Sequence, residues 1–532
     1  MNIAALVEDN IRRFGERETI YFEGRWYTNV ERNSNANRLG NALKALGIKK
    51  GDKVAVQLPN CPPVLWAFPA ILKIGGVVVP LSPLLRPDEA AYIYQDSGVA
   101  AVISSSDYLE RIKQAQKEAT GLQHIILVDK EDEPGTISYE KIMAESSDEL
   151  AIEETDNDDV ATLMYTAGTT GRPKGVMHTH YSLYTNCAGL LETIMVSRST
   201  TLKTVIGTRE PETGQLVEEV HEVSGLDAGQ TSLGVLPLSH SFGIAVMNVG
   251  YLVAGRSILM KWWNVEEALK AIERFGITTF AGVPTMYVQV LNFPDLDKYD
   301  LSSIRYCACG SAPLPVEVIH AWKEKFGLDI GEGWGLTEAG ANNSGQPADR
   351  PPKYGSIGKC LQKCNTMKIF DEEGKEVPQG QVGEIVIKGP TIMKGYWNMP
   401  EETAEVIKDG WLYTGDIGYV DEDGYFYITE RKKDLIIRGG ENIYPREVEE
   451  ILYQHPKVME AGVIGIPDKV YGEEIKAFVS LKPGASATAE ELIAFCKERL
   501  ATFKIPKSVQ FMDSLPKSLV GKVLRKELRA LG

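Results

Sequence analysis

Apolar and polar residues follow two periods along the first part of the chain, one typical of helices and one typical of strands. Helical patterns alternate with short apolar runs, so helices are expected at 35–46, 64–72 and 87–97, and strands at 53–58, 77–79 and 100–104. The alternation resumes later, with strands expected at 234–236 and 278–282 and helices at 265–275 and 316–326. Strands that alternate with helices favour a doubly wound parallel sheet, so we predict an α/β fold here.

The pattern changes near residue 355, where turn residues separate short strands. Strands are expected at 367–370, 384–388 and 425–428, with turns at 371–374, 409–411 and 421–424, which predicts a small antiparallel or barrel-like region. A charged cluster at 430–434 then precedes a compact α+β segment, with helices expected at 446–454 and 489–500 and strands at 460–466 and 475–482. We place a domain boundary near Lys433, between a large domain at 1–432 and a small one at 433–532.

Length, charge and cysteine usage narrow the class of protein. A chain of 532 residues is too long for one core, so two or more domains are expected. The net charge of −16 argues against non-specific nucleic-acid binding, because phosphate backbones favour basic surfaces. Seven scattered cysteines form no disulfide pattern and indicate a reducing compartment. The close pairs Cys307/Cys309 and Cys360/Cys364 have no neighbouring His, so buried thiols are favoured over structural zinc.

No targeting or membrane-spanning segment is expected. The N-terminus lacks a basic stretch followed by an apolar run, so no secretory signal is visible. The longest apolar region, 65–85, contains Lys73 and several Pro and Gly residues, and predicts a buried helix, a turn and a buried strand. We therefore expect a cytoplasmic protein with no integral membrane segment.

Residues 197–230 break the pattern, because they are rich in carboxylates and turn formers and show little periodicity. An acidic surface insertion or flap is expected. The same carboxylates could bind calcium, but no loop with calcium-ligand spacing is present.

Residues 165–175 contain three glycines, three threonines and a lysine. Glycines let the backbone approach a ligand closely, and exposed N–H groups in such a turn bind anions. The hydroxyls and Lys174 add donors and charge, so the segment predicts a polyphosphate-binding loop. It is not a Walker loop, because Pro173 stands where that pattern needs Gly. The alternative is an ordinary surface loop.

Four further segments carry candidate chemistry. Trp334 stands between glycines and suits stacking on a nucleobase. Thr337 and Glu338, in the same segment, could hold Mg²⁺. The alternative for this segment is a turn with a packed Trp. Asp416 follows a Gly turn and could accept ribose hydroxyls. His240 follows a predicted strand and could line a carboxylate site, although a structural histidine is the commoner outcome. Lys522 lies on a Pro- and Gly-framed loop that could reach a phosphate, or belongs to a solvated basic tail.

These segments occur in order along one chain, and together they resemble the adenylate-forming superfamily of acyl-CoA synthetases, firefly-type luciferases and peptide-synthetase adenylation domains. Within it the chain resembles the AMP-forming carboxylate–CoA ligases. The resemblance covers nearly the whole length and rests on residues 58–60, 75–83, 165–175, 334–338, 413–416, 431–434 with 439–445, and 516–522. It implies ATP, Mg²⁺ and CoA as cofactors. The implied reaction forms acyl-AMP and pyrophosphate from the acid and ATP, and the CoA thiol then expels AMP.

The resemblance implies a role for each matching residue. Lys522 would bridge the attacking carboxylate and the α-phosphate, and His240, Thr166 and Glu338 complete the implied catalytic set. Thr337 and Glu338 would hold the metal. The implied nucleotide-binding set is Thr166, Ala167, Gly168, Thr169, Thr170, Gly171, Lys174, Ser311, Ala312, Pro313, Glu332, Gly333, Trp334, Gly335, Leu336, Thr337, Asp416, Arg431 and Lys522. Two positions depart from the family pattern: Ala167 replaces Ser, and Trp334 replaces the more usual Tyr.

The implied architecture has a large N-terminal domain of doubly wound α/β subdomains with a small β-barrel-like region, and a small mobile α+β C-terminal domain. In the family this domain pivots between the two steps, and the pivot matches Lys433. After the pivot, Gly439, Gly440 and Glu441 would line the CoA tunnel.

The residues that match the acyl pocket are mostly small or apolar: His240, Phe242, Gly243, Gly282, Thr285, Cys309, Gly310 and Leu336. Residues 281–286 are most similar to those of medium- or long-chain fatty-acid ligases. A benzoate-like or alicyclic acid is the alternative.

Rival functions remain. Peptide-synthetase adenylation for a carrier protein would need Asp after Phe242, where Gly243 stands. A luciferase-type oxygenase side activity stays open. A non-catalytic nucleotide-binding protein should have lost Lys174, Glu338 or Lys522, and all three are retained. A homodimer is a further expectation, and Lys522 is a candidate target of a lysine acetyltransferase and deacetylase, because acetylation removes its charge.

Overall fold

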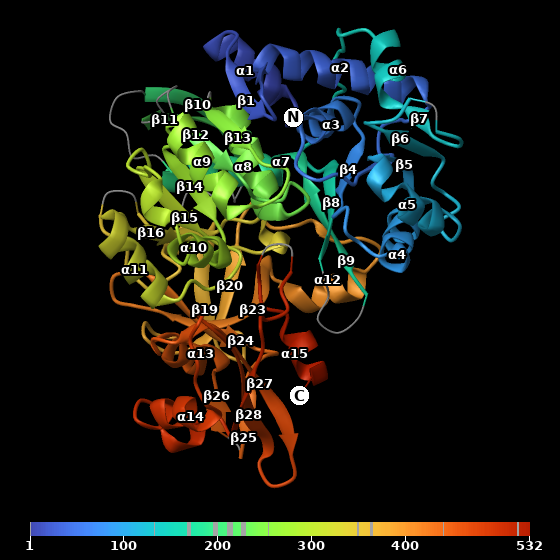
Figure 1. Cartoon of the computed structure of the whole chain (residues 1–532). Helices are drawn as coiled ribbons and strands as arrows, with labels where there is room; N and C mark the ends of the chain where they lie inside the picture. The colour runs from blue at the N-terminus through green and yellow to red at the C-terminus, as the bar shows by residue number, and fades with distance from the viewer. Residues whose placement is uncertain are drawn as a thin grey trace.

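The computed structural model describes residues 2–131, 133–166, 172–194, 201–209, 216–224, 230–253, 255–347, 350–361, 365–439, 441–518 and 521–531. Figure 1 shows a large N-terminal part above a smaller C-terminal part. The predicted α/β class, with a large N-terminal and a small C-terminal domain, is confirmed by this architecture. No helix within the described ranges is long and apolar enough to span a membrane.

The first sheet comes mainly from residues before 180. Its eight strands lie in the order β21–β9–β8–β4–β3–β5–β6–β7, with bounds Gly395–Tyr396, Lys174–Thr179, Val160–Thr166, Val77–Pro80, Lys53–Val56, Val99–Ser104, His124–Leu127 and Ile137–Ser138. The strands from β8 to β7 are parallel. Helices α2 (Asn29–Ala45) and α3 (Pro62–Lys73) cover one face, and α4 (Pro87–Ser97) and α5 (Leu109–Gln116) cover the other. Cover on both faces explains why the central strands are apolar runs.

The second sheet positions most of the site. Its seven strands lie in the order β16–β15–β14–β12–β13–β1–β2, with bounds Ile330–Glu332, Tyr306–Cys309, Thr279–Gly282, Thr231–Gly234, Arg256–Leu259, Glu18–Phe22 and Arg25–Thr28. All neighbours are parallel except β1 and β2. On one face pack α9 (Val265–Phe275), α10 (Pro284–Leu291) and α11 (Val316–Phe326). The segments after β12, β14, β15 and β16 lead into one region, as expected at the carboxyl ends of parallel strands.

The third sheet is antiparallel, as the turn-separated strands predict. Its order is β19–β20–β23–β22, and β24 pairs with the C-terminal half of β23. The bounds are Thr366–Phe370, Gly383–Lys388, Trp411–Val420, Ile407–Lys408 and Phe426–Arg431. Figure 1 places it between the two parallel sheets and the C-terminal elements.

The C-terminal part is α+β. Its sheet has the order β26–β25–β28–β27 with β29 beside β28, and the bounds are Glu441–Ile443, Ile436–Arg438, Gly472–Leu481, Val458–Asp468 and Ser508–Phe511. The packing helices are α13 (Pro445–Tyr453), α14 (Ala489–Lys497) and α15 (Arg525–Leu531). Further helices are α1 (Ala5–Phe14), α6 (Tyr139–Glu145), α7 (His180–Ile194), α8 (Ser241–Leu252) and α12 (Pro400–Val406), and the short strands β17 (Ser344–Gly345) and β18 (Lys359–Cys360) pair with each other.

Several expected boundaries need correction. The helix expected at 35–46 begins at Asn29, because Thr28 caps it: the Thr28 hydroxyl accepts from the Glu31 N–H, and the Glu31 carboxylate accepts from the Thr28 N–H. The strand expected at 234–236 is β12, which ends at Gly234. The thiols of Cys307 and Cys309 are buried, as expected, whereas Cys360 is half-buried and Cys364 lies outside the described residues.

The acidic stretch is more regular than its composition indicates. Within 197–230, β10 (Thr201–Arg209) and β11 (Leu216–Ser224) form a two-stranded antiparallel sheet that pairs with no other described strand. The sequence analysis named no strands in this stretch, because it shows little periodicity, yet β10 and β11 pair across nine positions. Residues 195–200, 210–215 and 225–229 lie outside the description.

Candidate active site

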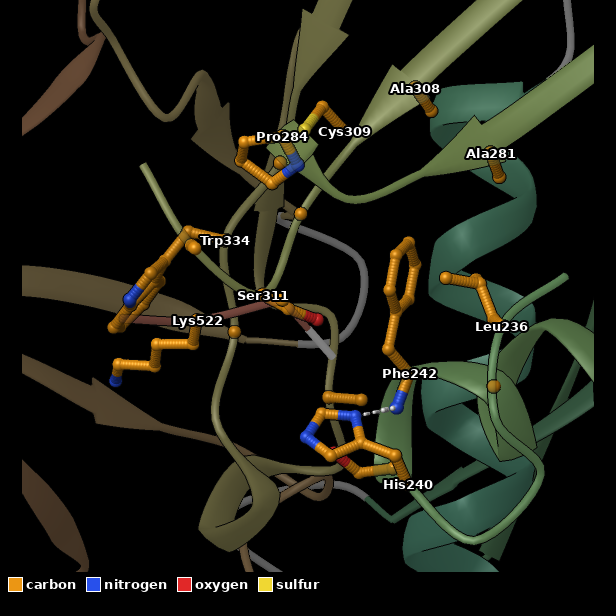
Figure 2. A pocket seen from close by; sticks show the side chains of 18 of the residues that line it. Leu236, His240, Phe242, Ala281, Pro284, Ala308, Cys309, Ser311, Trp334 and Lys522 are labelled. Atoms are coloured by element: carbon orange, nitrogen blue, oxygen red, sulfur yellow. Dashed lines mark hydrogen bonds between the residues drawn. The ribbon is translucent and has the colours of Figure 1, made fainter. Parts of the chain in front are cut away.

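A cavity of about 1300 Å³ opens where the second sheet, the third sheet and the C-terminal part meet. We call it the central cavity. In Figure 2, Trp334 and Lys522 lie on one side of it, Phe242, Leu236 and Ala281 on the opposite side, and Ser311 and His240 between them. The expected site residues that line it are Thr166, Lys174, His240, Phe242, Gly243, Thr285, Cys309, Gly310, Ser311, Ala312, Pro313, Glu332, Gly333, Trp334, Gly335, Leu336, Thr337, Glu338, Asp416, Arg431, Lys433 and Lys522.

Other expected site residues are placed elsewhere. Residues 167–171 lie outside the description, as does Gly440. Gly439 directly follows β25 and Glu441 is the first residue of β26, and neither lines the cavity. Gly282 does not line it either: an added Cβ there would lie 3.1 Å from the Phe280 ring, and the preceding Ala281 lines the cavity instead.

The carboxylate of Asp416 is fixed on both oxygens. Asp416 and Arg431 are opposite each other on β23 and β24, and Nε of Arg431 lies 2.8 Å from Oδ1 of Asp416. The indole Nε1–H of Trp334 donates to Oδ2 over 3.0 Å. Asp416 is only 2% exposed, and its carboxylate raises the pKa of Arg431 further. The arrangement gives a buried, oriented acceptor beside a flat ring.

The turn that carries Trp334 has little room for side chains. A Cβ on Gly335 would lie 1.8 Å from the carbonyl oxygen of Ala341, so only glycine fits there. Trp334 is held by backbone hydrogen bonds to Ser344 in both directions, at 3.2 and 3.0 Å. Ser311, on the opposite wall, has a left-handed backbone with φ of 70°. Ser311 and Trp334 both line the cavity, and the Trp334 indole offers a face on which a planar ring could stack.

Two residues that line the cavity have buried oxygens without a hydrogen-bond partner in the described part of the chain: Oγ of Ser311 and Oε2 of Glu332. The other carboxylate oxygen of Glu332 accepts from the Leu314 N–H at 3.3 Å and lies 3.9 Å from an Arg446 nitrogen. Burial raises the pKa of Glu332 to about 7, with Arg446 opposing the shift. Unpaired buried oxygens at a cavity wall fit a ligand with its own N–H or O–H donors.

The anion-binding end is formed by β8 and β9. Thr166 and Lys174 pair directly across these strands, so the loop between them leaves the sheet at the cavity. Nζ of Lys174 lies 4.9 Å from the Tyr396 ring centroid. The Tyr396 hydroxyl donates to Oε1 of Glu338 at 3.1 Å, and burial followed by the Glu338 charge raises the pKa of Tyr396.

This end has the donor set for a hard cation. The carboxylate of Glu338 and the hydroxyl of Thr337 supply oxygen ligands, and Thr337 is held in place by its carbonyl, which lies 2.5 Å from Nε2 of His178. Within the described ranges no group of three or more His, Cys, Asp or Glu side chains could enclose a metal. Mg²⁺ typically takes one or two protein carboxylates together with phosphate oxygens and water, and Glu338 could supply such a carboxylate.

Lys522 reaches the cavity from a C-terminal loop. Hydrogen bonds between Ser518 and Lys522 close the loop, at 2.9 Å between backbone groups and 3.2 Å to the Ser518 hydroxyl. The loop packs tightly on the N-terminal domain, since a Cβ on Gly521 would lie 2.4 Å from Oγ1 of Thr285. Surrounding protein, and then the charge of Arg431, lower the pKa of Lys522 to about 8.

His240 sits beside this lysine as a neutral ring. It caps α8, because its Nδ1 accepts from the Phe242 N–H at 3.3 Å (Figure 2). Burial and the charge of Lys522 lower the pKa of His240 to about 4. An imidazole that is neutral at physiological pH can line a pocket next to a cation.

Sequence reasoning missed the ion pairs made by the two arginines of α15, one of which joins the C-terminal part to β24. Arg525 lies 2.8 Å from Glu430 and 2.9 Å from Glu449, and Arg529 lies 2.8 Å from Asp434. The basic residues after Lys522 are therefore not a free tail. Their acidic partners are up to 95 residues away in sequence, so no local pattern marked the pairing.

Sequence reasoning also missed most of the apolar wall. On one face of the second sheet, Ala281 pairs with Ala308 and Thr279 with Tyr306, and all four line the cavity. On α8 the lining includes residues at helical spacing from Phe242: Val246 and Gly250. The sequence signals for these residues were the alternation of side chains along β14 and β15 and the i, i+4 spacing along α8. Neither signal identifies the wall until it is known which face of each element lines the cavity.

Comparison with known proteins agrees with this geometry. Residues 7–397 match the AMP-binding enzyme family, and residues 447–522 match the AMP-binding enzyme C-terminal domain. A long-chain-fatty-acid–CoA ligase of Bacillus subtilis (strain 168) is 38% identical over 554 residues, covering 99% of this chain and 94% of that protein. A feruloyl-CoA synthase of an Amycolatopsis species is 36% identical over 507 residues, covering 94% and 93%.

A solved structure extends the likeness to three dimensions. The anthranilate CoA ligase AuaEII in complex with anthranoyl-AMP matches with a TM-score of 0.88 and 30% identity, covering 100% of this chain and 97% of that one. Identity above 30% over nearly the whole of two relatives, together with a family match over most of the chain, shows common membership. The chain therefore belongs to the AMP-binding enzyme family, among its adenylate-forming CoA ligases.

Proposed function

We propose that the protein activates a carboxylic acid with ATP to form acyl-AMP and pyrophosphate, and then transfers the acyl group to CoA with release of AMP. The observation that carries the proposal is the meeting of three features in one cavity: the Trp334–Asp416 pair, the Lys522 ammonium and an apolar extension beyond Phe242. The first feature would bind the nucleotide, the second would stabilise the negative charge that develops at the phosphate, and the third would hold the acyl chain.

In the first step, the acid's carboxylate oxygen attacks the α-phosphorus of ATP, and the bond to the β-phosphate oxygen breaks to release pyrophosphate. Trp334 and Ser311 would flank the adenine, and Asp416 would accept hydrogen bonds from the ribose hydroxyls. Lys522 would contact both the attacking carboxylate and the α-phosphate, so its charge offsets the repulsion between them. No protein nucleophile is needed, because positioning and charge stabilisation carry most of such a reaction.

Thr166, Lys174 and the loop between them would hold the outer phosphates. Glu338, assisted by Thr337, would hold Mg²⁺, which neutralises phosphate charge when bound. The hydrogen bond from Tyr396 to Glu338 keeps one carboxylate oxygen in a fixed orientation. At this end the protein would therefore supply the oriented Glu338 carboxylate as a metal ligand and the Lys174 ammonium as a positive charge.

The second step needs a different arrangement of the C-terminal domain. In the arrangement described here Lys522 occupies the cavity, while Gly439 and Glu441, the residues expected near CoA, lie outside it. A pivot at Lys433, which begins the domain that we place at 433–532, would exchange the two. It would break the ion pair between Arg525 and Glu430 and the hydrogen bond from the Arg446 N–H to Glu430. The CoA thiol would then attack the acyl carbon and expel AMP.

The acid that we favour is a medium- or long-chain one. The cavity is large and continues past Phe242 between α8 and the face of the second sheet that carries Ala281 and Ala308. Small side chains on that face leave room for a flexible chain. An aryl acid is the alternative, favoured by the likeness to a feruloyl-CoA synthase and an anthranilate CoA ligase.

The test is acid-dependent pyrophosphate release with Mg·ATP, with and without CoA, over fatty, benzoic and cyclohexane-carboxylic acids. CoA-dependent turnover that yields AMP would support the ligase and identify its acid. Pyrophosphate exchange without CoA turnover would move the acceptor to a carrier protein. No turnover with any acid would contradict the proposal.

A further inference from the structure

The central cavity continues well beyond the acyl-pocket residues around Phe242. It follows α8 across the second sheet, where Ser232 on β12, Ser257 on β13 and Ile20 on β1 stand side by side in register and all line it. The lining at this far end includes Thr19 and Arg32. Arg32 comes from α2, which Figure 1 shows at the opposite end of the molecule from α13 and α15.

Arg32 is a buried cation with no anionic partner in the described part of the chain. It is 4% exposed, and its Nε and Nη2 are buried without any hydrogen-bond partner. Its guanidinium lies over the Tyr251 ring, 4.5 Å from the centroid. The carboxylate of Glu18 on the adjacent β1 strand lies 3.6 Å from Arg256 instead. Thr19 is 2% exposed, and its hydroxyl is also unpartnered.

Such a group is costly to keep without a ligand. A guanidinium stays protonated in proteins, so burial cannot neutralise it even though burial lowers the pKa of Arg32. Contact with an aromatic ring compensates for only part of the lost hydration. Carboxylates and phosphates both bind a guanidinium through paired charge-assisted hydrogen bonds, and because Arg32 lines the same cavity as Phe242, the far end of an acid substrate could bring a carboxylate to it. A purely structural role, in which Arg32 only anchors α2 on Tyr251, would leave its donors unused.

We propose that the far end of the cavity binds a second carboxylate, so that the preferred substrate is an α,ω-dicarboxylic acid. One carboxyl group is adenylated beside Lys522, and the other pairs with Arg32 and accepts from the Thr19 hydroxyl. The distal carboxylate takes no part in bond making, so the chemistry of both steps is that of the proposed function, on which this inference rests. Apolar and small side chains between the two ends match the methylene chain.

The first experiment uses the wild-type enzyme alone. Pyrophosphate release is measured for straight-chain α,ω-dicarboxylic acids of increasing length, each beside the monocarboxylic and ω-hydroxy acids of the same length. We expect kcat/KM for the diacid to exceed that for both partners by roughly 10- to 100-fold at the length that spans the cavity, the range given by a charge-assisted hydrogen bond. A preference for the monoacid or the ω-hydroxy acid at every length overturns the inference. Failure to turn over any acid would instead contradict the proposed function itself.

The second experiment compares variants. Arg32→Met keeps an apolar stem of similar length but removes the charge, and should lower the ratio of diacid to monoacid kcat/KM at least about tenfold. The ratio is the readout because a loss of folded protein lowers both numbers equally. Arg25→Met, which removes an exposed cation on β2 that does not line the cavity, is the matched control and should leave the ratio within about twofold. An unchanged ratio in Arg32→Met overturns the inference, and the wild-type length series decides the matter if that variant does not fold.

Discussion

The indole Nε1–H of Trp334 donates a hydrogen bond to Oδ2 of Asp416 over 3.0 Å, although 82 residues separate the two in sequence. Arg431 holds the other oxygen of the same carboxylate. The ring proposed to stack on adenine and the carboxylate proposed to bind ribose are therefore directly bonded to each other. A Tyr at this position has no ring N–H, so the substitution relative to the usual family residue changes how the carboxylate is oriented.

Trp334→Phe should separate stacking from carboxylate orientation. The ring face remains, but Asp416 loses a buried donor worth about 1.5–3 kcal/mol, so KM for ATP in the adenylation assay should rise about tenfold or more. Trp262→Phe, at a 43% exposed position, is the control and should leave KM unchanged. Equal KM in Trp334→Phe and wild type would show that the bond does not orient Asp416 for ribose.

Lys522→Ala should impair the first half-reaction but not the second. Removing the charge beside the α-phosphate should slow acyl-AMP formation about 100-fold or more, because a positioned charge in a low-dielectric site contributes on that scale. Thioester formation from supplied acyl-AMP should be largely preserved. Lys497→Ala, an exposed lysine on α14, serves as the control. Equal loss in both half-reactions would contradict the role given to Lys522.

The pH profile of adenylation should show the loss of the charge on Lys522. The pKa of Lys522 is lowered to about 8 by the surrounding protein and by Arg431, so the charged form is lost as the pH rises through that value. We expect kcat/KM for acyl-AMP formation to fall above about pH 8. Lys522→Arg keeps its charge at higher pH and should remove this alkaline fall, whatever its absolute rate. A fall at the same pH in both enzymes would assign it to another group.

Gly521→Ala should impair adenylation by steric conflict. The added methyl would lie 2.4 Å from Oγ1 of Thr285, so the loop could not dock without a shift, and acyl-AMP formation should fall about tenfold. Gly484 shares the left-handed backbone, with φ of 76° against 69°, but has no atom within 4 Å. Gly484→Ala therefore carries the backbone strain without the conflict. Similar losses in the two variants would show that strain alone is responsible.

Glu332→Gln should stabilise the nucleotide-free protein at neutral and higher pH. Burial raises the pKa of Glu332 from its ordinary 4.5 to about 7, so the carboxyl binds a proton more tightly in the folded state. Stability therefore falls as the pH rises from about 4.5 to 7, by ~3 kcal/mol at most, and stays lower above that range. The Tm difference between variant and wild type should grow from pH 5 to pH 8. A difference that is constant with pH would contradict the shift.

The sequence by itself determined the fold class and the chemistry of the nucleotide end. Helices such as α4, α9 and α11 were predicted at the bounds they have, because periodicity and end signals are local. The segments around Lys174, Trp334, Asp416 and Lys522 were identified for the same reason. Glycines, hydroxyls and charges lie within a few residues of each other there.

Tertiary structure decided the contacts that those segments make with one another. The bond from Trp334 to Asp416, the pairing of Arg525 with Glu430 and the conflict that an added methyl at Gly521 would make with Thr285 all join residues far apart in sequence. The place of Arg32 at the far end of the acyl cavity was likewise invisible, since an arginine in an amphipathic helix is usually on the surface. Its burial, with the Tyr251 ring of α8 over its guanidinium, is a property of the assembled elements rather than of any local pattern.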